Sequence, residues 1–407
     1  MEHVAVTGMG IVAPIGHDVE TFWQGLIEGS CAVAPIPGGD GLPGNRLWAA
    51  VPDTFLERAP LPAEALRNTD RFTRFALVAA DQAVRQAAAE PLDTLRTAVV
   101  IGNTMGGFPF VTAAQQEYLT QGSRSVPPKL MALVIPNMPA ARVALHYRLH
   151  GPQLALSTAC ASSLDAVGLA ARMIERGEVD LALAGGTEDL LAHLVYESLM
   201  RAGALSRNPD PATASRPFDA ARDGFVMGNG AALLLLERAE HAAARGARVL
   251  AHIRGYGQVA DAYHITSPEP SGEWELLAMR HALDDAALDT RRTPPVIFAH
   301  GTATVVGDAA EIAAINRLCA ASARVPSVTS LKGHLGHSMA ASGVMSLIAG
   351  ILGLERGLVV QTLGTHRVDA AAHFDVVAER ARPLSFDSFH VNAFGFGGQN
   401  SSLVVSR

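Results

Sequence analysis

LALSTACASSLDAVGLAARMI, residues 154–174, joins a short apolar run to a segment with apolar residues at helical spacing. The run closes with two hydroxyl residues, Ser157 and Thr158, and Cys160 follows in a turn of small residues. The apolar positions of the helical segment are Leu164, Val167, Ala171 and Ile174. Cys160 is therefore expected where a buried strand passes into a helix. Free backbone N–H groups and the helix dipole favour an anion at that point, which predicts an easily formed thiolate.

A free cysteine is more often a small buried hydrophobe than a nucleophile. We interpret Cys31 and Cys319 in that way. For Cys160, the stretch around it leaves both interpretations open.

Length and composition limit the class of protein. The chain has 407 residues with 49% hydrophobic content, which suits two domains or one duplicated domain. A net charge of −7 argues against a nucleic-acid surface. Three widely spaced cysteines predict neither a disulfide framework nor a zinc site, and they fit a reducing compartment.

The chain lacks the marks of export or membrane insertion. Its first residues, MEHVAVTGMG, carry an acid and a histidine where a signal peptide would carry positive charge. Apolar runs are shorter than the ~18–20 residues that span a bilayer, and the nearest candidate, 344–354, contains glycines. We therefore expect a cytoplasmic protein with no membrane partner.

The hydrophobic pattern predicts a chain of alternating strands and helices. Expected strands are 4–7, 97–101, 181–184 and 231–236, with turns at 8–10 and 185–187; expected helices are 18–29 and 70–88; expected loops are 34–63 and 205–224. The glycine-rich turn 102–107 lacks the Lys-Ser/Thr of a phosphate loop and the G-x-G-x-x-G order. We reject a nucleotide site there.

The order of elements recurs in the second half of the chain. The strand and Gly/Thr turn of TAVVIGNTMGG (97–107) recur in PVIFAHGTATVVG (295–307). The strand, turn and helix around Cys160 recur in residues 326–351, and the Gly turn and strand of residues 228–238 recur in 397–407. An internal duplication, with both halves contributing to one site, is the simplest interpretation.

Polar residues follow two expected strands of the second half. His300 comes directly after the strand 296–299, and Lys332 and His337 lie at the start of the second Ala/Gly-rich helix. A single histidine at such a place is usually structural. Two of them, together with Cys160, indicate a catalytic group.

Four motifs together resemble those of the β-ketoacyl-[acyl-carrier-protein] synthases, in particular the type II elongating branch and related type II polyketide ketosynthases. They are TACASS (158–163), HGT (300–302) with Asp308 and Glu311, Lys332 through Gly336-His337, and NAFGFGG (392–398). The resemblance runs almost end to end. It implies an α/β thiolase fold, a duplicated five-layer αβαβα arrangement, with one half over 1–247 and the other over 248–407, and usually a dimer.

The resemblance implies a 3-oxoacyl-[acyl-carrier-protein] synthase, an acyltransferase that performs decarboxylative Claisen condensation. Cys160 would hold the acyl chain as a thioester, and His300 and His337, as neutral imidazoles, would stabilise the malonyl-derived enolate. The backbone N–H groups of Cys160 and Phe396 would form the oxyanion hole, and Phe396, between two glycines, would gate acyl entry. Lys332 would orient the site through Glu311, with Asp308 nearby; the alternative is an ordinary salt bridge.

Three residues depart from the family pattern. Gly333 stands where many relatives have serine, Asn229 replaces a frequent acid, and His334 adds a third imidazole. We interpret His334 as structural or rim-facing. None of these changes removes the nucleophile, so condensation should survive them.

The implied partner is an acyl carrier protein, acyl- or malonyl-loaded, with substrates on its phosphopantetheine and no further cofactor or metal. Because the carrier is acidic, docking on this acidic chain needs a local basic patch. Candidates from loops or helix edges are Arg67, Arg71, Arg74, Arg124, Lys129 and Arg207. Scattered solvated charges are the alternative for each of them.

Several other functions remain to be weighed. The protein could act as a homodimer or as the ketosynthase subunit of a heterodimer with a chain-length-determining partner, in fatty-acid or polyketide (polyene-type included) biosynthesis. A thiolase or priming ketosynthase would replace one histidine by Asn or a second Cys. A non-catalytic partner subunit would generally lack Cys160, and a papain-like hydrolase does not explain the second histidine.

Overall fold

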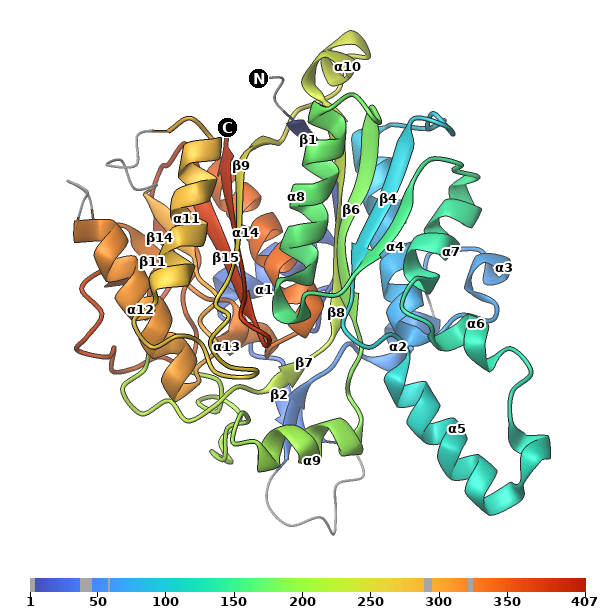
Figure 1. Cartoon of the computed structure of the whole chain (residues 1–407), viewed down its shortest axis with the longest axis horizontal. Helices are drawn as coiled ribbons and strands as arrows, with labels where there is room; N and C mark the ends of the chain where they lie inside the picture. The colour runs from blue at the N-terminus through green and yellow to red at the C-terminus, as the bar shows by residue number, and fades with distance from the viewer. Residues whose placement is uncertain (1–3, 37–45, 58, 289–294, 321–324) are drawn as a thin grey trace.

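A computed structural model describes residues 4–36, 46–57, 59–288, 295–320 and 325–407. Its framework is an eleven-stranded mixed sheet, accompanied by two small sheets (Figure 1). The strands are Val4–Val12 (β1), Val33–Pro35 (β2), Leu47–Ala49 (β3), Thr97–Gly102 (β4), Gln153–Leu156 (β5), Leu181–Glu188 (β6), Met227–Gly228 (β7), Gly230–Arg238 (β8), Ala251–Ala260 (β9), Val296–Phe298 (β10), Ser327–Thr329 (β11), Leu358–Val359 (β12), Asp375–Val376 (β13), Arg382–Pro383 (β14), Ser388–Gly395 (β15) and Gln399–Ser406 (β16).

The large sheet consists of two sets of five strands in the same order. From one edge inward the order is β5-β4-β6-β8-β1, and the second set reads β11-β10-β15-β16-β9, with β13 added outside β11. In each set the first three strands are parallel and the last two are antiparallel. The sets meet through a short pairing of β1 with β9. The strands thus follow the duplicated order that the sequence predicts; the division at residue 247 itself stays a prediction.

Helices form the other layers. They are Val19–Glu28 (α1), Asp53–Glu57 (α2), Ala63–Leu66 (α3), Arg71–Ala87 (α4), Phe108–Gln121 (α5), Leu130–Val134 (α6), Met138–Tyr147 (α7), Ser162–Glu175 (α8), His193–Arg201 (α9), Ala239–Ala244 (α10), Glu273–Asp285 (α11), Val305–Ala320 (α12), Lys332–Leu335 (α13) and Ser342–Arg356 (α14), with short 3₁₀ turns at Ser123–Ser125 (η1), Ala159–Ala161 (η2) and Met339–Ala341 (η3). The helices α8 and α14 contact each other between the two strand sets (Figure 1). Outside them, α4 and α7 cover one set and α11 and α12 the other. This is the five-layer αβαβα arrangement of the predicted thiolase fold.

Two turns predicted from glycine are wrong. Residues 8–10 continue β1, and residues 185–187 belong to β6. A Cβ on Gly8 would lie 2.0 Å from the carbonyl oxygen of Ala83, and one on Gly10 would lie 1.9 Å from that of Ala79. These glycines let α4 approach the strand closely, so they serve packing and not a change of direction.

The predicted loop over 34–63 contains short elements where it is described, namely β3, α2 and the end of β2. Residues 37–45 and 58 lie outside the described residues. The segment 205–224 carries turns and isolated bridges, as expected of a loop.

One helical segment, Met339–Arg356, is long and apolar enough to cross a membrane by length and composition. It has 18 residues, and 89% of that window is buried inside the fold. This segment lies in the central helical layer, and its apolar side chains face the strand sets on either side. That is the position of a core helix.

Candidate active site

The nucleophile candidate Cys160 lies on a strained turn between β5 and α8. Ala159, directly before it, has a left-handed backbone with φ of 50°. Such a conformation costs a non-glycine residue about 1–3 kcal/mol and persists where surrounding contacts enforce it. Those contacts include Thr158 Oγ1 donating to Asp165 at 2.5 Å and Tyr256 OH donating to the same carboxylate at 2.7 Å. The second strand set thereby holds the turn of the first.

The second elbow repeats this geometry in the other half of the chain. Met339 has φ of 44° and begins η3, and α14 begins at Ser342 as α8 begins at Ser162. His337 lies just before this turn. Its backbone is fixed from both sides, since its N–H donates to Val226 O at 2.7 Å and its carbonyl accepts from Gly228 N at 2.9 Å.

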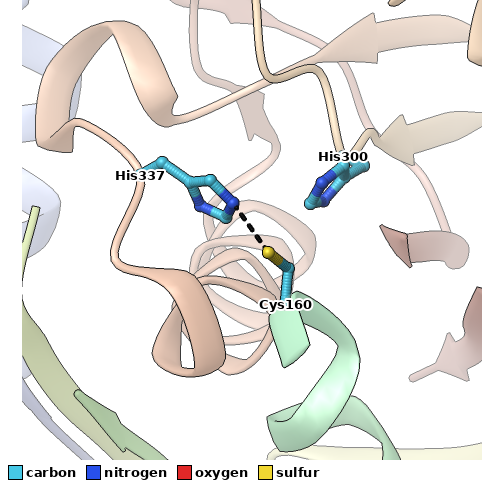
Figure 2. A group of neighbouring side chains, drawn as sticks. All are labelled: Cys160, His300 and His337. Carbon is cyan, nitrogen blue, oxygen red and sulfur yellow. Dashed lines mark hydrogen bonds between the residues drawn. The ribbon is translucent and has the colours of Figure 1, made fainter. Parts of the chain in front are cut away.

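The structure brings Cys160, His300 and His337 together (Figure 2). His337 Nε2 lies 3.1 Å from Cys160 Sγ, and the three potential ligand atoms of the group all lie within 4.8 Å of one another. The two imidazole rings are nearly perpendicular, with centroids 5.3 Å apart. Sulfur and imidazole nitrogen are also zinc ligands, but the positive charge of Lys332 beside His300 opposes a divalent cation here.

Burial dominates the electrostatics of this group. It raises the pKa of Cys160 to about 11, against the lowering effects of Lys332 and of the backbone N–H groups of Phe396 and Cys160. The expectation of an easily formed thiolate is therefore wrong for the free protein, because removing the sulfur from water outweighs the helix terminus. Burial, helped by the charge of Lys332, also lowers the pKa of both His300 and His337 well below its usual value. Both rings are neutral, as expected.

Lys332 acts on His300 and makes no direct ion pair with Glu311 among the described residues. Its Nζ donates to the backbone carbonyl of His300 and lies 3.5 Å from His300 Nδ1. Glu311 instead accepts the backbone N–H groups of His300 and Gly301, at 2.8 and 2.7 Å. Both residues thus fix the same backbone from opposite sides. Burial lowers the pKa of Lys332 and raises that of Glu311.

Asp308 lies one step further from the reacting atoms. Its carboxylate accepts the backbone N–H groups of Phe218 at 2.7 Å and Ala303 at 2.9 Å, and Arg222 lies 3.8 Å away. Burial raises the pKa of Asp308 to about 6. These contacts make Asp308 and Glu311 positioning residues for the loop that carries His300.

Phe396 lies at the end of β15, against the nucleophile. Its backbone N–H and that of Cys160 both face the Cys160 sulfur. Gly395 makes this approach possible, because a Cβ there would lie 3.0 Å from both Cys160 N and Thr158 O. The Phe396 side chain is 43% exposed. The two N–H groups of the expected oxyanion hole are therefore adjacent.

A cavity of about 360 Å³ opens onto the Cys160 group, within the usual size range of ligand pockets. Its lining includes the apolar residues Met105, Leu199 and Phe225 and the hydroxyl residues Thr302 and Thr304. The cavity can thus contact both an apolar chain and a more polar arm.

The three departures have structural explanations. A Cβ on Gly333 would lie 2.0 Å from Leu363 O, so a serine does not fit here. Asn229 links Val51 N and Asp189 at 2.8 and 2.9 Å. His334 is buried, with its ring nitrogens 2.9 and 3.1 Å from two backbone carbonyl oxygens, which makes it structural.

The candidate docking residues fall into two groups. Arg67, Arg124, Lys129 and Arg207 are exposed. Arg71 pairs with Asp53 and with Asp189, the latter at 2.8 Å, and Arg74 Nε donates to Thr69 at 3.2 Å. Because the guanidinium of Arg71 is already paired, we leave Arg71 out of the docking patch.

Sequence reasoning missed one residue that contacts the group and three that support the segments around it. Ser342 Oγ lies 2.9 Å from His337 Nδ1, and Asp165 and Tyr256 hold the Cys160 turn. Glu188 is buried nearby and accepts from Thr104 N at 3.0 Å and Thr104 Oγ1 at 2.6 Å. The repeated elbow places a serine at equivalent positions 162 and 342, which is the one signal that could have pointed to Ser342.

Comparison with known proteins gives a consistent result. Residues 1–242 match the family model described as Beta-ketoacyl synthase, N-terminal domain, and residues 250–366 match Beta-ketoacyl synthase, C-terminal domain. A relative from Staphylococcus aureus (strain N315), named 3-oxoacyl-[acyl-carrier-protein] synthase 2, is 36% identical over 100% of this chain and 98% of its own length.

Solved structures are similar over the whole chain. The ishigamide ketosynthase/chain length factor superposes with a TM-score of 0.91 at 32% identity, covering 100% of this chain and 99% of the other. A type II PKS ketosynthase, in complex with its acyl-carrier protein and bound to the hexaketide, superposes with a TM-score of 0.89 at 29% identity and the same coverage.

Proposed function

The chain belongs to the β-ketoacyl synthase family, and we propose that it extends carrier-bound acyl chains as a 3-oxoacyl-[acyl-carrier-protein] synthase. The observation that carries this proposal is the convergence of Cys160 with His300 and His337 at the meeting point of the two halves, beside a cavity of about 360 Å³. A sulfur nucleophile next to two neutral imidazoles suits acyl transfer followed by enolate chemistry.

In the first half-reaction, Cys160 Sγ attacks the carbonyl carbon of an acyl thioester. Its proton passes toward His337 Nε2, 3.1 Å away, and the oxyanion receives the N–H groups of Cys160 and Phe396. The bond from the carbonyl carbon to the carrier sulfur then breaks, and that sulfur leaves with the proton. The acyl chain remains on Cys160.

In the second half-reaction, a malonyl thioester enters on a malonyl-loaded carrier protein. Its C–C bond to the carboxylate breaks, CO₂ leaves, and the electron pair forms an enolate whose oxygen is stabilised by N–H groups of His300 and His337. The enolate carbon attacks the acyl-Cys160 carbonyl. The sulfur of Cys160 leaves and is reprotonated, and a 3-oxoacyl chain two carbons longer remains on the carrier.

The partner is an acyl carrier protein, which the similar type II PKS complex contains. The substrates arrive on its phosphopantetheine, so the reaction asks for no other cofactor. The enzyme pairs with itself or with a ketosynthase-like chain-length subunit; the similarity to a ketosynthase/chain length factor favours keeping the second arrangement. The proposal includes a cytoplasmic location, which rests on the spacing of its three free cysteines.

The test follows the acyl group. The purified protein is exposed to acyl-carrier donors and analysed by intact-protein and peptide mass spectrometry, alone and with candidate sister subunits, before malonyl-dependent elongation is assayed over a chain-length series. We expect one acyl adduct on Cys160 and none in Cys160→Ala, which should also fail to condense. An adduct on Cys31 or Cys319 would refute the assignment.

A further inference from the structure

Ser342, at the first position of α14, is the partner that the described residues offer to Nδ1 of His337. Its Oγ lies 2.9 Å from that nitrogen, and both residues are buried. A serine hydroxyl is a donor and an acceptor and rotates to suit its neighbour. It can therefore accept from a protonated Nδ1 or donate to an unprotonated one.

His300 has a different kind of partner at the same ring position. Its Nδ1 faces Lys332 Nζ at 3.5 Å. An ammonium has only hydrogens to offer, so Nδ1 must accept and the proton of the neutral ring is held on Nε2. His300 is thus fixed as an Nε2–H donor, whereas His337 is free to hold its proton on either nitrogen.

The proposed reaction needs both neutral tautomers of His337, with the ring proton on Nδ1 in one half-reaction and on Nε2 in the other. Before acylation, Nε2 faces the Cys160 thiol at 3.1 Å and has to accept its proton, which places the ring hydrogen on Nδ1. After acylation no thiol remains, and Nε2 has to donate to the enolate oxygen. The change is balanced, since one proton leaves Nδ1 and one arrives at Nε2 by exchange with solvent.

We propose that Ser342 is a positioning residue that supports both tautomers of His337, one for each half-reaction. This inference rests on the proposed function. In the free enzyme the Ser342 hydroxyl accepts from Nδ1–H. In the acyl-enzyme the same hydroxyl donates to Nδ1.

The duplicated fold supplies an independent comparison. Ser162 occupies the equivalent position of the first elbow, and its Oγ accepts from Thr158 N at 2.9 Å and donates to Ala159 O at 2.6 Å. That serine is used to cap its own turn. In the second elbow the serine contacts the imidazole of His337 instead, so its hydroxyl serves the reacting group.

The test separates the two half-reactions in Ser342→Ala. Acylation of Cys160 is timed by intact-protein mass spectrometry. Malonyl decarboxylation is measured separately on enzyme whose Cys160 has been alkylated with iodoacetamide, because the carboxamidomethyl group stands in for the acyl group. Without the hydroxyl both tautomers lose a partner at Nδ1. A buried N–H without an acceptor costs more than a ring nitrogen without a donor, so the ring is held as Nε2–H and the first half-reaction suffers more. We expect acylation to slow about tenfold, the effect of one neutral hydrogen bond, and decarboxylation to change by less than about threefold.

Two further variants and one spectrum complete the design. Ser342→Thr restores the hydroxyl and should restore acylation, while Ser346→Ala removes another buried serine one turn along α14 and should change neither rate. In wild-type protein, ¹⁵N spectra of His337 should change from the Nδ1–H to the Nε2–H pattern on acylation. This measurement holds even if Ser342→Ala does not fold.

Equal loss of both rates in Ser342→Ala, no loss of either, or an unchanged tautomer on acylation would overturn the role of Ser342. Failure of the proposed function looks different, because the wild-type enzyme itself would then form no adduct on Cys160 or release no CO₂ from malonyl carrier protein.

Discussion

At the level of single residues, Cys160 reacts as a buried thiol. Burial raises its pKa to about 11, so the sulfur holds its proton at neutral pH until a substrate arrives. The proton has to move as the sulfur attacks, and a neutral ring with its Nε2 at 3.1 Å is suitably placed to receive it. A charged imidazole could not do so, which gives the lowered pKa of His337 a direct consequence for the reaction.

His300 should matter in one half-reaction and not the other. Its Nε2–H is positioned for the enolate, while the contact to the sulfur comes from His337. We expect His300→Ala to lower malonyl decarboxylation about 100- to 1,000-fold, the effect of removing one oxyanion donor. Cys160 acylation, timed by intact mass, should fall by less than about tenfold. A variant that loses both steps equally would contradict this division of roles.

Glu188 makes a pH-dependent contribution to stability. Burial raises its pKa to about 8, from an ordinary value of 4.5. Between these two values the folded protein holds a proton that the unfolded chain has released, so this carboxyl's contribution to stability falls as the pH rises through that window. Its full value is present below about pH 4.5.

Glu188→Gln removes this titration and keeps an oxygen for the two Thr104 donors. Relative to wild type, the variant should become progressively more stable from pH 5 to pH 8, measured as the free energy of unfolding in denaturant. Glu57→Gln, which alters an exposed carboxyl of α2, is the matched control and should show a constant difference. A constant difference for Glu188→Gln as well would contradict a raised pKa at this residue.

At the level of elements, glycine shows what sequence pattern can and cannot predict. The strand-to-helix order around the Cys160 elbow followed from apolar spacing, because it is set by local periodicity. The expectation that this strand is buried is wrong, since β5 is the edge strand of the sheet and its residues are mostly exposed. Gly8 and Gly10 were misread as a turn, since a glycine needed for close packing looks the same in sequence as one needed for a bend. Gly255 and Gly257 of β9 repeat the arrangement, with a Cβ at either lying 2.0 Å from a carbonyl oxygen of α11.

The same limit applies to the site. Cys160, His300 and His337 stood out because each follows a strand and matches a motif. Ser342, Asp165 and Glu188 did not, because their contacts join residues that only the fold brings together, or depend on which way a helix face points. The pKa of Cys160 was mispredicted for a related reason: helix position is visible in sequence, whereas depth of burial is not.

The turn before α8 depends on a contact from the second strand set. Tyr256 OH donates to Asp165 at 2.7 Å, and Asp165 in turn holds Thr158, two residues before the nucleophile. Tyr256→Phe should therefore lower the free energy of unfolding by about 1–3 kcal/mol, since a buried carboxyl loses one hydrogen bond. Tyr263→Phe, at a 58% exposed ring, is the control in the same denaturant titration. Equal stability of the two variants would show that the turn does not need this contact.

At the level of the whole molecule, one edge of the large sheet is left open. The strand β5 lies at that edge with exposed residues, directly before the Cys160 turn. Large apolar side chains are exposed on the neighbouring helices, including Leu119, Met131 and Leu145. An open edge beside apolar side chains is typical of a surface covered by another subunit.

The variant Leu154→Lys with Met131→Glu should weaken self-association or pairing with a sister subunit. It adds charge to the open edge and to the apolar region beside it. Light scattering after size exclusion should show a shift toward a single 42.6 kDa chain, whereas Val325→Lys, in the other half of the chain, should leave the mass unchanged. A variant that keeps the wild-type mass would place the interface elsewhere.

Docking of an acidic carrier protein presents an electrostatic problem, because this chain carries a net charge of −7. Long-range attraction is absent, so recognition has to depend on exposed positive charges close to the cavity. Arg67 and Arg207 are exposed, whereas the guanidinium of Arg71 is already paired, so these two are the candidates we test. Changing both to Glu replaces two attractions by two repulsions.

The expected result of Arg67→Glu with Arg207→Glu is an apparent KM for acyl-carrier substrate raised about tenfold, with kcat nearly unchanged, from about 0.5–1 kcal/mol per exposed charge. Since exposed charges are screened by salt, the difference from wild type should shrink as ionic strength rises. Arg176→Glu makes the same charge change at the C-terminal end of α8. The length of this helix separates it from Cys160 by about 20 Å, more than one Debye length, so KM should stay within about twofold of wild type. If Arg176→Glu raises KM as much as the double variant, the carrier responds to total charge and the patch has no special role.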